Sequence, residues 1–287
     1  MKAGVLTFLT EKSGNPGDIF KEAENLGFES FWVAEHLVVP TAYTTHYPRS
    51  ADGKVPDFYA HLIDPFVALS IAAHATSRIK LATGICLLPE RNVIETAKVT
   101  ASLDLYSNGR LMLGVGAGWF PEEAQVMGVD FKRRWLHLRE SIGALRELWS
   151  KDEASYEGEI IKFPSVRLFP KPVQKPGPKI ILGAHDPKYA LKRVAQYADG
   201  WCPGGLSAAT ARECIPQIKR MAAEAGREAD KLEFGVLLQA PPALDAIRQY
   251  AEAGVSRVVV AAGAAALGDG VKAVRDVAVM VERAAQA

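Results

Sequence analysis

The chain has 287 residues, of which 48% are hydrophobic and 23% charged, and its formal net charge is +1. This composition is that of a folded globular protein and excludes an intrinsically disordered chain. Its basic residues are scattered, which excludes a charged surface for nucleic acid or for an anionic membrane, so we expect a small-molecule ligand.

Neither end of the sequence nor its interior predicts export or membrane insertion. Met1 leads directly into a strand-like segment, and no apolar run reaches the roughly 18 residues of a membrane span. The three cysteines, at positions 86, 202 and 214, are widely spaced and show no metal-ligand pattern. We expect a reduced, cytoplasmic protein with buried thiols.

The first elements alternate between strand and helix. Residues 2–9 predict a strand, residues 18–26 a helix that ends before Gly27, and residues 30–34 a second strand. A helix follows over residues 64–75, with Asp64 as N-cap and Pro65 in its first turn.

Residues 38–62, between the second predicted strand and this helix, form a long segment that we call the lid loop. It is rich in tyrosine and proline and too long for a simple strand-to-helix connection. We therefore expect it to be a binding loop over the ligand.

The alternation continues to the C-terminus with one interruption. Strands are predicted at 79–87, 110–115, 179–182, 200–202, 232–238 and 255–261, and helices at 92–106, 131–149, 187–198, 207–225, 242–253 and 268–285. Residues 151–178 predict a small hairpin followed by proline-rich chain, which we interpret as an insertion. Eight β/α repeats predict an α/β fold, a closed (β/α)8 TIM barrel spanning residues 1–287 as one domain, with the ligand at the C-terminal ends of the strands.

A doubly wound dinucleotide-binding sheet is the alternative. Gly114, Gly116 and Gly118 follow a predicted strand, but their spacing is G-x-G-x-G and the strand is the fourth. A dinucleotide fingerprint is expected at the first strand-to-helix turn, so the pattern favours the barrel.

Glu35 and His36, at the end of the second strand, are the first candidates for chemistry. A histidine at a strand tip can act as acid or base near neutral pH, although a structural histidine would look the same. Because side chains alternate along a strand, Glu35 should face the opposite way. The other histidines lack metal-ligand spacing, so no metal site is expected.

The remaining candidates for cofactor binding lie at strand ends, where glycine lets a ligand approach and backbone N–H groups can face an anion. A purely structural explanation is also open for each of these positions: a glycine needed for packing, a tight turn or a capped helix. With Glu35, this candidate set comprises Thr83, Gly84, Ile85, Gly116, Ala117, Gly118, Gly183, Ala184 and Gly204.

Several ordered segments resemble the luciferase-like monooxygenase superfamily. They are residues 31–36 (FWVAEH), 81–85 (LATGI), 107–119 (SNGRLMLGVGAGW) and 197–201 (YADGW). The stretch 118–123 (GWFPEE) is most similar to the branch that uses the deazaflavin coenzyme F420.

The resemblance implies a barrel that binds a flavin-type ring, usually as a homodimer, with His36 beside the ring and the substrate. It also implies a non-prolyl cis peptide at Gly84–Ile85 behind the ring, and contacts to the coenzyme or its phosphate from residues 116–118 and 183–184. Gly183-Ala184 departs from the Gly-Gly that is common there.

The expected activity is hydride transfer between F420 and a small organic substrate covered by the lid loop, with His36 moving the proton. One alternative is an FMN-dependent monooxygenase or reductase on the same barrel. Another is a non-catalytic protein that binds a flavin or deazaflavin.

Overall fold

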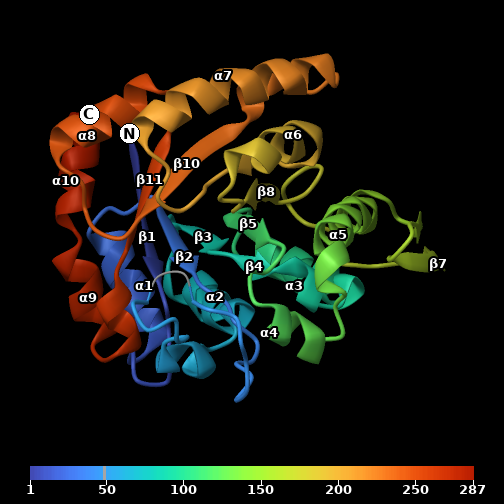
Figure 1. Ribbon diagram of the computed structural model, residues 1–287, viewed down its shortest axis with the longest axis horizontal. Coiled ribbons are helices and arrows are strands. Elements are labelled where there is room, and N and C mark those ends of the chain that lie inside the picture. The colour runs from blue at the N-terminus through green and yellow to red at the C-terminus, as the bar shows by residue number, and fades with distance from the viewer. Residues whose placement is uncertain (48–49) are drawn as a thin grey trace.

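A closed parallel barrel forms the centre of the protein, described here from a computed structural model for residues 1–47 and 50–287 (Figure 1). Its strand order is β3-β2-β1-β11-β10-β9-β8-β5-β4, and β3 also pairs with β5, which closes the sheet. The strands are β1 (Lys2–Thr7), β2 (Ser30–Val33), β3 (Lys80–Thr83), β4 (Cys86–Leu87), β5 (Leu111–Gly116), β8 (Lys179–Leu182), β9 (Gly200–Trp201), β10 (Glu233–Leu238) and β11 (Arg257–Ala261). Since β3 and β4 pair with successive parts of β5, they share one position, which leaves the eight strand positions predicted.

Helices surround the barrel (Figure 1). They are α1 (Pro16–Asn25), α2 (Pro65–Ala75), α3 (Val93–Tyr106), α4 (Pro121–Val126), α5 (Arg134–Ser150), α6 (Pro187–Tyr197), α7 (Ala208–Glu224), α8 (Leu244–Glu252), α9 (Gly270–Asp276) and α10 (Val279–Gln286). Short 3-10 turns occupy Asp57–His61, Leu88–Glu90, Phe131–Arg133, Ala229–Lys231 and Gly263–Ala266. Among the described residues, no helix has the length and apolar character needed to cross a membrane.

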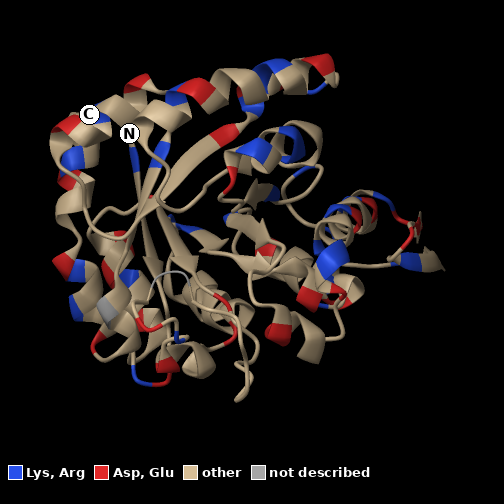
Figure 2. Ribbon diagram, viewed as in Figure 1, with Lys and Arg blue, Asp and Glu red and all other residues tan. Residues whose placement is uncertain are grey.

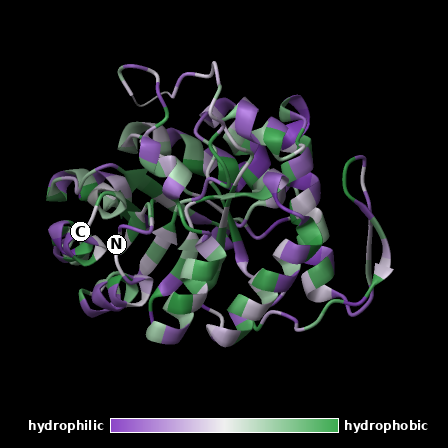
Figure 3. Ribbon diagram, turned by 90° about the horizontal axis from the view of Figure 1, so that it is seen from below, coloured by the Kyte–Doolittle hydropathy of each residue, from purple (hydrophilic) through white to green (hydrophobic). Residues whose placement is uncertain are grey.

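The strands contribute to two hydrophobic clusters, as the alternation of their side chains requires, and a third small cluster of Val55, Tyr59 and Phe120 lies at the lid loop. One set packs between strands and helices, and a smaller set fills the barrel interior. In Figure 3 the central strands are mostly hydrophobic, whereas hydrophilic and hydrophobic residues alternate along the outer helices. The interior set comprises Leu6, Trp32, Ala82, Met112, Ile181, Cys202, Val259 and Ala261.

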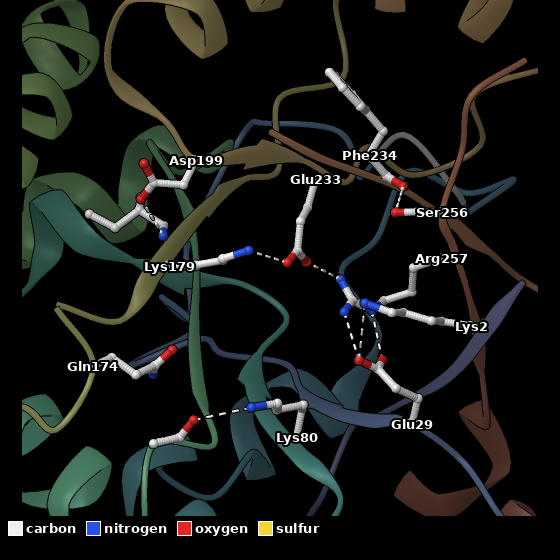
Figure 4. A network of polar contacts seen from close by, with 12 residues as sticks. Lys2, Glu29, Lys80, Gln174, Lys179, Asp199, Glu233, Phe234, Ser256 and Arg257 are labelled. Carbon is white, nitrogen blue, oxygen red and sulfur yellow. Dashed lines mark hydrogen bonds and ion pairs between the residues drawn. The ribbon is translucent and has the colours of Figure 1, made fainter. Parts of the chain in front are cut away.

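Charged side chains close the end of the barrel where the strands begin (Figure 4). Arg257, which is 3% exposed, lies 2.8 Å from Glu29 and 3.0 Å from Glu233, and Glu233 also binds Lys179. Burial acts to raise the pKa of Glu233, but Lys179 and Arg257 lower it to about 2. The pairing makes burial of these charges tolerable, so this end of the barrel serves the fold and the other end remains for a ligand.

The predicted insertion is an antiparallel hairpin of β6 (Ala154–Glu157) and β7 (Lys162–Val166). Asp64 caps α2 and Asp186 caps α6, each followed by proline, as predicted.

Two elements that the sequence predicted as continuous are interrupted in the structure, so the prediction was wrong for both. The strand at 79–87 is interrupted at residues 84–85, where a side chain on Gly84 would lie 2.6 Å from Leu6 and 3.0 Å from Trp32. The helix at 268–285 is divided into α9 and α10, because Val277 and Ala278 form i to i−3 hydrogen bonds that redirect the chain.

Candidate active site

A cavity of about 690 Å³ opens at the C-terminal ends of the barrel strands. It is bordered by His36 and by every residue of the candidate cofactor-binding set except Thr83. Thr83 is fully buried and donates a hydrogen bond of 2.7 Å to the carbonyl oxygen of Gly114, so it joins β3 to β5. The structure therefore brings together nearly all of the residues named from the sequence.

His36 belongs to a buried carboxylate–imidazole pair. Its Nδ1 lies 2.5 Å from Oε2 of Glu123, whose side chain is fully buried and whose other oxygen accepts a hydrogen bond of 2.8 Å from the N–H of Leu37. On the other side of the ring, Nε1 of Trp119 lies 3.3 Å from Nε2 of His36.

These contacts assign the proton on the imidazole. An indole N–H can only donate, so Nε2 of His36 accepts from Trp119, and Nδ1 carries the proton that is donated to Glu123. The resulting neutral imidazole has its lone pair on Nε2. The indole N–H occupies the place from which a substrate hydroxyl would donate to that atom.

Glu35 faces away from His36, as the strand alternation predicts. Its carboxylate accepts a hydrogen bond of 2.7 Å from the N–H of Leu87 and pairs with Arg91, which also lies 2.6 Å from Asp64. Glu35 borders the cavity, but these partners occupy both of its oxygens, so it ties β2 to β4.

The floor of the cavity is built around Ile85. The Gly84–Ile85 peptide is cis, as the family resemblance implied. A Cβ atom on Gly116 would lie 2.2 Å from the Ile85 side chain, and one on Gly183 would lie 2.8 Å from it. These two glycines therefore make room for the side chain of Ile85, and all three residues border the cavity.

The lid loop covers the His36 end of the cavity with aromatic rings. The hydroxyl oxygens of Tyr47 and Tyr59 are 2.8 Å apart, and the Tyr59 ring centroid lies 4.8 Å from that of His36. The Tyr47 ring centroid lies 5.4 Å from that of Trp119. Residues 48 and 49 of the predicted loop lie outside the described residues.

Glu122 attaches this loop to α4. Its carboxylate accepts hydrogen bonds of 2.8 Å and 3.0 Å from the N–H groups of Thr44 and Thr45. Burial acts to raise the pKa of Glu122, but these hydrogen bonds outweigh it and lower the pKa to about 2. Neighbouring glutamates thus have different tasks, because Glu123 holds His36 and Glu122 holds the lid.

The end of the cavity beside α5 and α6 carries basic side chains. Arg134 and Arg193 border it, and their guanidinium groups lie 3.7 Å and 3.8 Å from the ring centroids of Phe131 and Trp135. Among the described residues, neither arginine forms an ion pair with a carboxylate. Burial and, secondarily, Arg193 lower the pKa of Arg134. With the basic residues of α5 and α6 (Figure 2), this end has the charge to bind a phosphate.

The buried thiols of Cys86 and Cys202 are not activated as nucleophiles. Burial and the charge of Glu35 raise the pKa of Cys86, and burial raises that of Cys202 to about 12. Cys202 borders the cavity and remains a neutral thiol at neutral pH. No cluster of potential metal ligands occurs within residues 1–47 and 50–287.

Sequence reasoning missed Glu123, the function of Trp119, and the arginines 134 and 193. Glu123 stands in the first turn of α4, where an acidic residue is favoured simply by the helix. Its position directly after the β5 loop was the available signal, but sequence alone does not separate a partner for His36 from a helix-stabilising residue.

Comparison with known proteins identifies the family. Residues 10–286 match the family described as luciferase-like monooxygenase. The chain belongs to the luciferase-like monooxygenase family. This membership places it among flavin- or deazaflavin-dependent oxidoreductases.

Relatives within and near the luciferase-like family include proteins with either coenzyme. An uncharacterized protein of Mycobacterium tuberculosis is 36% identical over 260 residues, covering 90% of this chain and 91% of that protein. The structure of an F420-dependent secondary alcohol dehydrogenase in complex with an F420-acetone adduct has a TM-score of 0.76, with 18% identity and coverage of 99% of this chain and 98% of that chain. The FMN complex of a 3,6-diketocamphane monooxygenase from Pseudomonas putida has a TM-score of 0.66, 17% identity and coverage of 85% and 68%.

Proposed function

We propose that the protein is an F420-dependent oxidoreductase that transfers a hydride between the coenzyme and a small organic substrate, with His36 as proton donor or acceptor. The observation that carries this proposal is the buried His36–Glu123 pair in a cavity that is lined by aromatic rings around His36 and by Arg134 and Arg193 beside α5 and α6. The similarity to an F420-dependent alcohol dehydrogenase over nearly the whole chain supports the choice of coenzyme.

The residues present fit a flavin-type coenzyme. Gly116 and Gly183 carry no side chain beside Ile85 where they border the cavity, which suits a planar ring, and Arg134 and Arg193 suit a phosphate. When bound, the deazaflavin supplies two-electron hydride chemistry, while the protein supplies orientation and charge.

His36 handles the proton that accompanies the hydride. In the oxidative direction, a substrate hydroxyl replaces the Trp119 N–H at Nε2 and gives its proton to that atom, and the carboxylate of Glu123 stabilises the imidazolium that results. In the reductive direction, the imidazolium returns the proton to a carbonyl oxygen. The same two residues therefore serve both directions.

The aromatic end favours an uncharged substrate. Phe8, Tyr47, Tyr59 and Trp119 border the cavity there, and the polar atoms that they and His36 offer are hydroxyl, indole and imidazole groups. Among the described lid residues, those that border the cavity are the two tyrosines. A compound with one hydroxyl or carbonyl group on an apolar frame matches this lining.

Optical titration of the purified protein with F420 and with FMN, separately, tests the coenzyme. We expect saturable binding of F420. Tight binding of FMN without binding of F420 would overturn the choice and leave an FMN-dependent monooxygenase or reductase as the function. Hydride exchange between bound F420 and a panel of alcohols and ketones then separates an enzyme from a non-catalytic coenzyme-binding protein.

We also propose that the protein is a homodimer. α2 is apolar on nearly every face, and its Val67 and Ile71 remain 59% and 39% exposed. On the neighbouring α3, Leu105 and Tyr106 are 42% and 82% exposed. A second copy of the chain would cover the exposed apolar residues of α2, which we call the α2 face.

A further inference from the structure

Glu90 is a buried carboxyl group for which the described residues provide no hydrogen-bond partner. It ends the 3-10 turn Leu88–Glu90 and is 5% exposed, and within the described part of the chain neither of its oxygens is hydrogen-bonded. Buried carboxylates normally have partners because desolvation of an unpaired charge is costly. The group is therefore unusual, and nothing in the fold described above explains it.

The carboxyl group of Glu90 lies directly behind the wall of the cavity. A Cβ atom on Gly118 would lie 2.8 Å from Oε1 of Glu90, and Gly118 borders the cavity. Gly118 has a φ of +81°, so glycine is favoured there for its backbone as well as for space. One residue thus separates Glu90 from the space assigned to the coenzyme.

The charged groups around Glu90 are already engaged with other partners. From the end of β2, Glu35 pairs with Arg91, which in turn also binds Asp64. From α4, Glu123 pairs with His36. On the other side of the turn, Arg134 donates a hydrogen bond of 3.2 Å to the carbonyl oxygen of Gly118.

The surroundings of Glu90 favour its protonated form. Burial, followed by the negative charges of Glu123 and Glu35, raises the pKa of Glu90 to about 8. At neutral pH the group is mainly an uncharged acid, and above pH 8 it becomes a second anion near Glu123. A second anion would strengthen the hold of the imidazolium on its proton.

We propose that Glu90 is a positioning residue, an uncharged carboxylic acid behind Gly118. Because Glu90 carries no charge, Glu123 is the one anion that acts directly on His36, and His36 can release its proton. This inference rests on the proposed function of His36 in proton transfer. It adds a third residue, outside the cavity, to the groups that set the charge of the reacting imidazole.

NMR titration of the coenzyme-free protein tests the electrostatic link. The His36 ring resonances, assigned by their loss in His36→Asn, should show an inflection near pH 8 in the wild type that is absent in Glu90→Gln. Glu95→Gln is the matched control, because Glu95 is exposed on α3, and it should retain the inflection. Identical curves for wild type and Glu90→Gln would overturn the proposal. If Glu90→Gln does not fold, Glu90→Met makes the same test with another neutral side chain of similar length.

Turnover provides the functional readout. In the oxidative direction His36 accepts the proton, and a second anion should make it a stronger base, so wild-type kcat/KM should rise above about pH 8. The profile of Glu90→Gln, normalised to its own value at pH 7, should lack that rise. Identical normalised profiles for wild type and Glu90→Gln would also overturn the proposal. Because the NMR titration needs neither coenzyme nor substrate, its result stands even if the proposed activity is wrong.

Discussion

The Nδ1 atom of His36 lies 2.5 Å from Oε2 of Glu123, although 87 residues separate them in the chain. His36 follows β2 and Glu123 lies in α4, just after β5. The β2–β3 and β3–β5 pairings place these two strands on either side of β3, so closure of the barrel assembles the pair.

Replacement of His36 by Asn should lower turnover by about 10²- to 10⁴-fold, the usual contribution of a general acid or base. Coenzyme affinity should change little, because the ring surface and the basic end are untouched. Steady-state kinetics and optical titration measure the two quantities. Unchanged turnover would remove His36 from the mechanism.

Replacement of Glu123 by Gln should lower turnover by roughly 10- to 100-fold, because an amide of the same size cannot stabilise an imidazolium by charge. Since His36 and Glu123 act as a unit, the double variant His36→Asn, Glu123→Gln should resemble His36→Asn alone. Fully multiplicative losses would show that the two residues act independently.

Replacement of the neighbouring Glu122 by Gln should loosen the lid and leave the chemistry intact, so KM should rise more than kcat falls. The carboxylate of Glu122 has a lowered pKa of about 2, so its contribution is complete above the ordinary value near 4.5 and is lost as the pH falls toward 2. Hydrogen exchange at the Thr44 and Thr45 amides, measured at pH 6, should be faster in the variant. Equal exchange rates in the variant and the wild type would show that Glu122 does not hold the lid.

Replacement of Ile71 by Lys on the α2 face should convert the expected dimer to a monomer, because the charge would be buried in the interface. Light scattering after size-exclusion chromatography gives the mass. Val279→Lys on α10, which has the same exposure of 39%, is the control and should remain dimeric. A wild-type monomer would exclude the homodimer.

Replacement of Arg257 by Ala should destabilise the fold by about 3–5 kcal/mol, the range for breaking a buried ion pair and leaving its partners unpaired. Glu29 and Glu233 would then lose their shared cation. Denaturant unfolding measures the loss, and coenzyme binding at the other end should persist under native conditions. A change below about 1 kcal/mol would show that the cluster contributes little.

The repeating elements could be predicted because alternating β/α periodicity and capping residues such as Asp64 and Asp186 are local signals. His36 and the glycine positions could be located because strand ends meet at one edge. The partners could not, since Glu123 and Glu90 acquire their function only from residues distant in the chain. The division of the last helix into α9 and α10 likewise has no clear local signal.

The position of Ile85 between Gly116 and Gly183 has a consequence for sequence variation among relatives. The Ile85 side chain fills the space that a side chain at position 116 or 183 would need. A relative with alanine in place of either glycine should therefore carry a smaller residue in place of Ile85. Conversely, exchanging Ile85 for alanine should make Gly116→Ala tolerable. Such paired substitutions would change the depth of the cavity without altering any polar group in it.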